Sequence, residues 1–77
     1  MHEKKMTERI TQIIEDVSGI AVAPNDKLSY MGIDSLSLVT IIAMVEEKFG
    51  FFFLDDDLQP ENLQTVKDIV VIAGKYV

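Results

Sequence analysis

Apolar residues recur at helical spacing in three stretches of this chain, and glycine or proline separates the stretches. The one run that resembles a strand, residues 51–54, has no second run with which it could pair in a sheet. This pattern predicts an all-α fold: a small four-helix bundle, with three principal helices plus one short helix and a long first loop. At 77 residues the chain is expected to form a single domain, 1–77.

The first and last stretches each show one apolar stripe, and in the first stretch polar residues fill the other face. In the first stretch Thr7 is a possible N-cap and Gly19 a natural stop. The last stretch begins at Thr65, which forms a capping-box pattern with Asp68. The residues expected in the core are Met6, Ile10, Ile13, Ile14 and Val17 in the first stretch and Val66, Ile69, Val70, Ala73 and Val77 in the last.

The middle stretch, residues 35–49, differs from the other two because its apolar residues form two stripes. The first stripe has the spacing of one buried face and consists of Leu38, Ile41, Ile42, Val45 and Phe49. The second stripe lies on an adjoining face and consists of Leu36, Val39 and Ala43. It would be buried if this helix is central in the bundle, or it would form an exposed strip on which a partner docks.

The long first loop, residues 20–32, contains the turn signal Pro24-Asn25-Asp26. Three apolar residues near the end of this loop could cover the core, and they are Leu28, Tyr30 and Met31. Loops of this length in small domains are often functional.

Residues 51–54 are expected to form an extended connector after Gly50 ends the middle helix. Alternation places Phe52 on the side opposite Phe51 and Phe53, without deciding which side faces inward. The three aspartates at positions 55–57 could then open a short helical turn, which Pro60 limits. They are interpreted as a solvated loop or as a charged docking element, because a calcium loop would need a central Gly and a terminal Glu.

The composition leaves few reactive side chains. The chain has no Cys, and its one His is at position 2, so disulfides, cysteine zinc sites, catalytic triads and histidine metal clusters are not expected. We therefore expect that the chain has no metal site and is not an enzyme.

Charge and hydropathy restrict the partners. Thirteen Asp and Glu against seven Lys and Arg give a net charge of −6, which disfavours nucleic acid and favours basic protein surfaces. The start of the chain resembles neither a signal nor a transit peptide, and no apolar run approaches the roughly 20 residues of a membrane span. A cytoplasmic monomer is expected.

The stretch that joins the long loop to the middle helix contains Gly32, Asp34 and Ser35. Asp34 is a good N-cap residue, which places Ser35 in the first helical turn, where backbone N–H groups lack partners. A phosphate esterified to Ser35 would meet the positive end of the helix dipole. Gly32 would allow a sharp turn or the close approach of another molecule. From spacing alone, an ordinary helix cap is the favoured interpretation of this pair.

In this stretch the sequence Gly32-Ile33-Asp34-Ser35-Leu36 resembles the Gly-x-Asp-Ser-Leu attachment motif of the acyl carrier protein family, which includes fatty-acid, polyketide and nonribosomal peptide carriers. The run Glu46-Glu47-Lys48-Phe49-Gly50 is similar to the end of the family's second helix. Residues 63–69 are similar to the entry of its last helix. The three segments occur in the family's order and spacing, over residues 6–76.

The resemblance implies that Ser35 is the attachment point of 4′-phosphopantetheine, which a separate phosphopantetheinyl transferase takes from coenzyme A. The thiol of this arm would carry acyl groups as thioesters, so the reactive sulfur is imported into a chain without cysteine. Asp34 would also help to place magnesium in the transferase complex, and Gly32 belongs to the same motif. Acyl-loading, condensing and other pathway enzymes would be further partners.

The family's partner-facing positions correspond to Leu36, Val39 and Ala43, with Glu46 and Glu47 as the acidic residues that remain on the second helix. Fatty-acid carriers usually place acidic residues directly after the attachment serine, where this chain has Ser37 and Thr40. This departure favours a specialised, polyketide-like pathway over general fatty acid synthesis. The alternatives are an aminoacyl or peptidyl carrier, a carrier-like adaptor that is never modified, and an unrelated bundle in which Asp34 and Ser35 only cap a helix.

Overall fold

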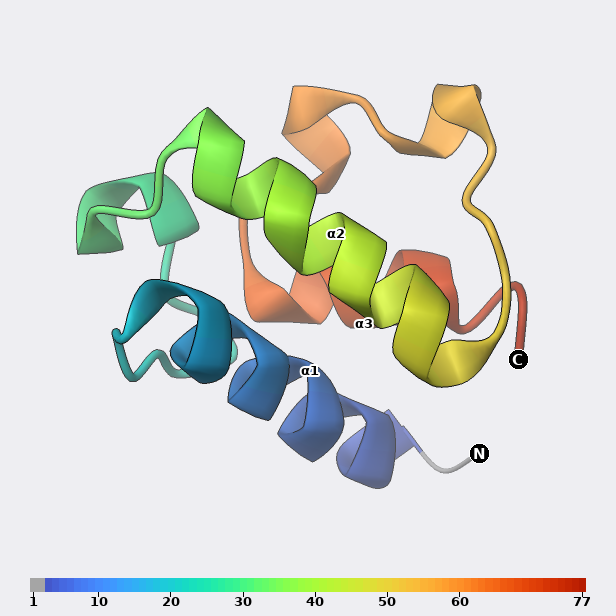
Figure 1. Cartoon of the computed structure of the whole chain (residues 1–77), viewed down its shortest axis with the longest axis horizontal. Coiled ribbons are helices and arrows are strands. Elements are labelled where there is room, and N and C mark those ends of the chain that lie inside the picture. Colours follow the sequence, from blue (N-terminus) through green and yellow to red (C-terminus); the bar gives the residue numbers. More distant parts are fainter. Residues whose placement is uncertain (1–2) are drawn as a thin grey trace.

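The structure is a computed structural model, and it describes residues 3–77. It contains three α-helices, α1 (Glu3–Ser18), α2 (Ser35–Phe49) and α3 (Val66–Ala73), and three single 3-10 turns, η1 (Leu28–Met31), η2 (Asp55–Asp57) and η3 (Pro60–Asn62). In Figure 1, α2 crosses the middle of the molecule, with α1 on one side and the η2–η3 connection on the other. No strand occurs within this range, so the predicted all-α class is confirmed.

The predicted helical bundle is confirmed in part, since residues 3–77 contain the three principal α-helices but no fourth, short α-helix. The segment expected to supply a fourth, short helix contains two separate turns, η2 and η3. Pro60 explains the break, because it lacks an N–H and forces the residue before it out of the helical region. Gln59 accordingly has an extended backbone, with φ −78° and ψ 143°.

Four of the six helix ends lie where the sequence predicts them. Helix α1 starts at Glu3, so the predicted N-cap at Thr7 is wrong. The lysines at positions 4 and 5 are good helix formers, and no breaker separates them from Thr7. Helix α3 ends at Ala73, so Val77 lies outside it and is 47% exposed instead of in the core.

The capping box at the start of α3 is confirmed. The Asp68 amide donates to Thr65 Oγ1 at 3.1 Å, and the Thr65 amide donates to Asp68 Oδ2 at 3.2 Å. The long loop is bonded to the same region, because the Leu28 amide donates to the Gln64 carbonyl at 2.8 Å. The loop is therefore held against the start of α3.

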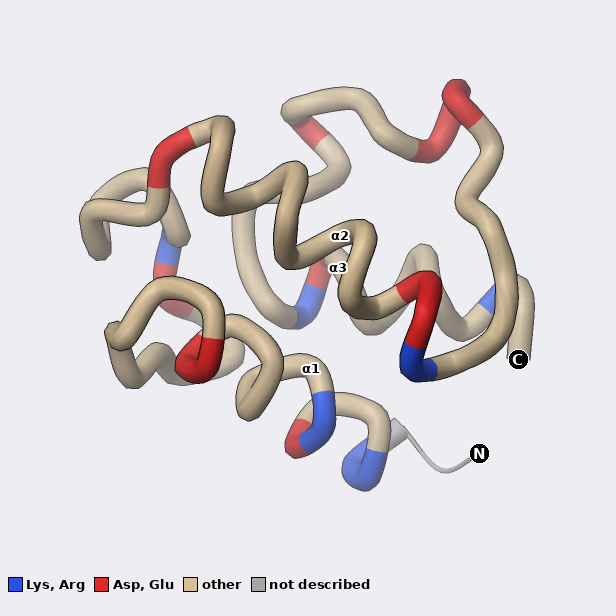
Figure 2. Tube along the Cα trace, in the orientation of Figure 1, with Lys and Arg blue, Asp and Glu red and all other residues tan. Residues whose placement is uncertain are grey.

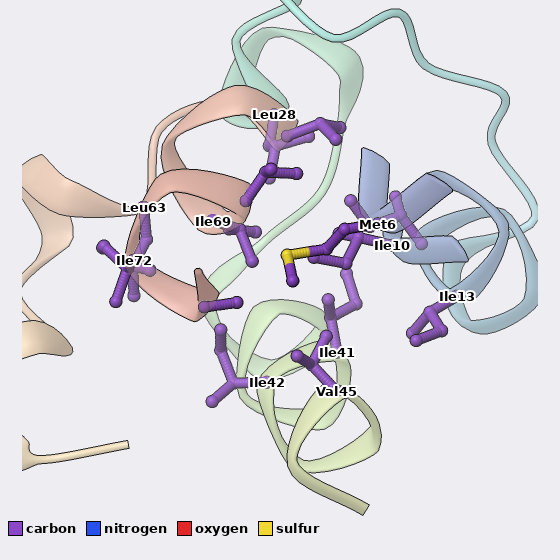
Figure 3. Packing of buried hydrophobic residues seen from close by; sticks show 14 of the residues in the cluster. Met6, Ile10, Ile13, Leu28, Ile41, Ile42, Val45, Leu63, Ile69 and Ile72 are labelled. Carbon is purple, nitrogen blue, oxygen red and sulfur yellow. The ribbon is translucent and has the colours of Figure 1, made fainter. Parts of the chain in front are cut away.

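The core lies between the three helices, and α1 packs against both α2 and α3. Figure 3 shows side chains from all three helices and from the connections meeting in one cluster. The expected core face of α2 is confirmed, with Leu38 and Phe49 at its partly buried edge. The buried residues of α2 and α3 are Ile41, Ile42, Val45, Val66, Ile69, Val70, Ile72 and Ala73.

In the long loop and in the segment after α2, some apolar side chains point into the core and others point to solvent. In the long loop Leu28 is buried and Met31 is partly buried, but Tyr30 is 82% exposed, so its expected place over the core is wrong. The tight turn η1 explains this, because it points Tyr30 away from the bundle while Leu28 points into it. After α2, Phe53 is buried and Phe52 is 83% exposed, which settles the orientation of this run.

Candidate functional site

The segment that leads into α2 is fixed by one glycine and one buried side chain. Gly32 has φ +89°, a left-handed conformation that glycine adopts without strain. A Cβ at this position would meet only Ile20 Cδ1, at 3.8 Å, so the backbone conformation and not crowding favours glycine. The next residue, Ile33, is 5% exposed, and its amide donates to the Leu28 carbonyl at 3.1 Å. The start of α2 is thus anchored to the core.

Asp34 is the N-cap of α2, as the sequence predicts. Its Oδ1 accepts a hydrogen bond from the Ser37 amide at 2.8 Å, and its carbonyl accepts one from the Leu38 amide at 3.0 Å. The hydrogen bond from the Ser37 backbone is the main reason why the pKa of Asp34 lies below its usual value of 3.8. A negative charge therefore stays at the positive end of the helix at neutral pH.

Ser35 is the first residue of α2, and its side chain is exposed. Among residues 3–77 its hydroxyl has no hydrogen-bond partner, and no histidine occurs there to act as a base. Lys27 borders the same surface groove, a neighbour that the sequence did not reveal, but its ammonium group lies over the ring of Tyr30, 5.6 Å from the centroid. Ser35 therefore presents an exposed hydroxyl at the start of α2.

Two surface grooves meet at Ser35. The groove between η1 and η3 has a volume of about 580 Å³ and a partly polar lining that includes Lys27 and Glu61. The groove between α2 and the η2–η3 connection has a volume of about 400 Å³ and a mainly apolar lining. Leu38 and Leu63 border both grooves. A group attached to Ser35 thus has an apolar groove beside it.

The second apolar stripe of α2 is exposed beside Ser35. Leu36 is 79% exposed and Val39 is 67% exposed, and Ala43 is exposed as well. The alternative in which this stripe belongs to the core is wrong, because all three side chains are exposed while Ile41, Ile42 and Val45 of the same helix are buried. Tyr30 adds an exposed ring across the first groove. Sequence reasoning missed Tyr30, since only the turn η1 directs it outward.

The two glutamates near the end of α2 lie in different environments. Glu46 is partly buried, and its Oε2 accepts a hydrogen bond from the Phe53 amide at 2.8 Å. It thereby holds the chain that follows α2, a role that the sequence did not reveal. Glu47 is exposed. Figure 2 shows acidic positions in red near the end of α2 and at its start.

Among residues 3–77 no group of three or more His, Asp or Glu side chains is placed to hold a metal ion. In the same part of the chain no helix has the length and apolar character needed to cross a membrane.

Comparisons with known proteins point to one family. A family model described as a phosphopantetheine attachment site matches residues 8–70. The acyl carrier protein of Tropheryma whipplei (strain Twist) is 37% identical, over 97% of this chain and 96% of its own length.

Two solved structures resemble the fold. A chain in the crystal structure of the Bradyrhizobium japonicum glycine:[carrier protein] ligase complexed with glycylated carrier protein is 26% identical, with a TM-score of 0.71 over 91% of this chain and 96% of that one. The solution structure of MacpD, an acyl carrier protein from Pseudomonas fluorescens involved in mupirocin biosynthesis, is 23% identical, with a TM-score of 0.81 over 95% of this chain and 71% of that one. At this identity the second likeness concerns the fold alone.

Proposed function

Because the chain belongs to the acyl carrier protein family, whose members carry acyl groups on a covalent 4′-phosphopantetheine arm, we propose that Ser35 is the residue to which the arm is attached. The observation that carries this proposal is the position of Ser35. Its unbonded hydroxyl is exposed at the start of α2, directly after the cap residue Asp34, where two grooves meet.

The residues around Ser35 fit a phosphate ester. The ester would lie at the N-terminus of α2, where the helix dipole favours negative charge. Asp34 remains ionised and is exposed, so its carboxylate is available to a magnesium ion held by another enzyme. Gly32 and the buried Ile33 fix the backbone that presents both residues.

The modification depends on a second protein. A serine hydroxyl needs a base when it attacks phosphorus, and Ser35 has none within hydrogen-bonding distance among the described residues. A phosphopantetheinyl transferase would supply the base and accept the proton. The oxygen of Ser35 forms the new bond to the phosphate of coenzyme A that bears pantetheine, and the nucleotide half of coenzyme A leaves. The chain is in this scheme a substrate and then a carrier, and not an enzyme.

The cargo is proposed to be an acyl group of a specialised, polyketide-like or fatty-acid pathway. The sequence of α2 next to Ser35 favours the specialised pathway, since Leu36, Ser37 and Thr40 provide no charge for a general fatty-acid partner to recognise. Leu36, Val39 and Ala43 would form the docking strip for pathway enzymes, and Glu47 would add one exposed charge.

An amino acid is the second candidate cargo. The observation that favours it is the likeness to a carrier protein that was crystallised in its glycylated form with its ligase. Analysis of the thioester on protein isolated from its own cells separates the two, since acid hydrolysis would release a fatty or polyketide acid in one case and an amino acid in the other.

The modification can be tested with purified protein. Incubation with coenzyme A, magnesium and a broad-specificity transferase is expected to add one phosphopantetheinyl group, detected by intact mass. Ser35→Ala should abolish the gain, whereas Ser29→Ala, at an exposed serine that lines the same groove, should leave it unchanged. A gain that survives Ser35→Ala would contradict the assignment of the site, and no gain with several transferases would favour an unmodified adaptor.

A further inference from the structure

A second exposed apolar patch lies on the connection after α2. The side chain of Phe52 is 83% exposed and that of Leu54 is 66% exposed. Exposure alternates along this segment, since Phe53 between them is only 6% exposed, so Phe52 and Leu54 both lie on its outer side. Phe51 and Phe53 point to the other side, where their rings meet edge to face with centroids 4.8 Å apart. Exposed apolar groups placed side by side usually mark an interaction site.

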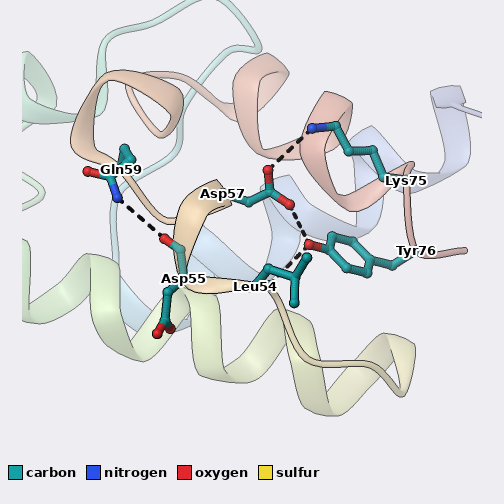
Figure 4. Close-up of polar contacts among 6 residues, drawn as sticks. All are labelled: Leu54, Asp55, Asp57, Gln59, Lys75 and Tyr76. Atoms are coloured by element: carbon teal, nitrogen blue, oxygen red, sulfur yellow. Dashed lines mark hydrogen bonds and ion pairs between the residues drawn. The ribbon is translucent and has the colours of Figure 1, made fainter.

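This patch is held on a fixed backbone. The Phe53 amide donates to Glu46 Oε2 at 2.8 Å, and the Leu54 amide donates to the Tyr76 hydroxyl oxygen at 3.1 Å. Phe51 stacks on the ring of Tyr76, with centroids 4.9 Å apart. Figure 4 shows the Tyr76 hydroxyl between Leu54 and the carboxylate of Asp57, to which it donates. Phe52 and Leu54 are therefore presented without the entropic cost of ordering a loose loop on binding.

Negative charge borders the patch. Asp55 and Asp56 follow Leu54 directly, and both are exposed. Within residues 3–77 neither carboxylate forms an ion pair, whereas Asp57 is engaged by Lys75 at 3.3 Å. Figure 2 shows the acidic turn η2 at the outer edge of the connection between α2 and α3. The two carboxylates without an ion-pair partner repel negatively charged surfaces and attract positively charged ones.

The charge excludes two of the possible occupants. Two copies of the chain would repel each other, because each has a net charge of −6. If their patches paired, the aspartates of one copy would also lie opposite those of the other. An anionic membrane would repel the aspartates as well. A protein with an apolar pocket bordered by Lys or Arg complements both the patch and its edge.

The patch is also separate from Ser35. The 15 residues of α2 lie between them, and at about 1.5 Å per residue the helix spans roughly 20 Å. A partner bound to the patch would leave Ser35 and the grooves beside it open. We propose that Phe52 and Leu54, bordered by Asp55 and Asp56, form a second docking surface for a pathway enzyme with a basic, apolar pocket.

The test uses the full chain carrying its phosphopantetheine arm, with the photoreactive amino acid benzoylphenylalanine at position 52. Position 71 provides the matched control, because Val71 is a 56% exposed apolar residue on α3. In an extract of the source cells, irradiation is expected to cross-link position 52 to an enzyme, whereas position 71 should give no such cross-link. The cross-linked peptide of the enzyme should contain Lys or Arg beside apolar residues. The cross-link should weaken when salt is raised.

The purified enzyme then allows the affinity to be measured. Phe52→Ser is expected to raise its Kd by about tenfold, as for one aromatic hot spot, whereas Val71→Ser should leave it nearly unchanged. Replacing both Asp55 and Asp56 with Asn should remove most of the salt dependence. Ser35→Ala should not affect the cross-link, so this surface and the attachment site are tested independently. Cross-links to a second copy or to lipid, equal labelling at both positions, or an unchanged Kd for Phe52→Ser would overturn the proposal.

Discussion

Leu36 and Ile42 are apolar residues of the same helix, but they lie in opposite environments. Leu36 is 79% exposed beside Ser35, and Ile42 is 8% exposed in the core. Sequence periodicity separates the two correctly, because a regular helix fixes the angle between its residues. The surface formed by Leu36 and Val39 is available to partners, and Ile42 belongs to the packing that keeps α2 in place.

Substitution of these two residues should therefore give different results. Ile42→Ala should lower the free energy of unfolding by about 2–5 kcal/mol, because it leaves a cavity in the core. Leu36→Ala should change it by less than about 0.5 kcal/mol, as for most surface positions, but should slow modification by the transferase or loading by a partner enzyme. Urea unfolding and loading rates measure the two effects. Equal destabilisation would show that both stripes are structural.

Three side chains have roles that no sequence pattern indicated, namely Tyr30, Glu46 and Tyr76. Each role depends on a contact or a turn that is defined only after the chain has folded. Glu46 bonds to Phe53 seven residues later, and Tyr76 bonds to Asp57 from 19 residues away. Periodicity and cap residues describe neighbours along the chain, so such distant pairs are beyond what they can predict.

At the scale of elements, local signals predicted both ends of α2 and the capping box of α3, because a cap depends on residues within one turn. The start of α1 and the end of α3 were less well predicted. No breaker precedes Thr7, and the apolar residue Val77 continues the helical spacing although the chain has left the helix. The final residues instead pack against the connection after α2, through Tyr76.

The stability that the contact between Tyr76 and this connection contributes depends on pH. Hydrogen bonding to Tyr76, followed by that to Lys75, lowers the pKa of Asp57 below 3.8, and the hydrogen bond to Asp57 raises the pKa of Tyr76 above 10.0. The stability from Asp57 is thus fully present above its unfolded pKa and is lost as pH falls through the lower folded value. The stability from Tyr76 is fully present below its unfolded pKa and is lost as pH rises through the higher folded value.

Tyr76→Phe should therefore reduce stability at neutral pH and have little effect at strongly acid or strongly alkaline pH. Tyr30→Phe is the matched control, because that ring is exposed and its hydroxyl makes no hydrogen bond among the described residues. Urea unfolding of both variants across the pH range measures the difference. If the two variants behave alike, the Tyr76 hydroxyl does not hold the connection.

At the scale of the whole molecule, the division of roles follows from size. A chain of 77 residues has little core in which an active site of its own could be enclosed, and the serine proposed as the attachment point, Ser35, is exposed at the start of α2. The all-α class, the course of α2 and the candidate attachment site could be predicted from the sequence. The grooves beside Ser35 and the patch at Phe52 could not, because they are formed by segments far apart in the chain.

The most direct test of the central claim is peptide mass spectrometry of the protein purified from its own cells. The peptide that contains Ser35 is expected to carry phosphopantetheine, with part of the population bearing a thioester-linked cargo, and fragmentation should place the group on Ser35. An unmodified Ser35 in protein that supports its pathway, or an arm on any other residue, would contradict the function proposed for this site.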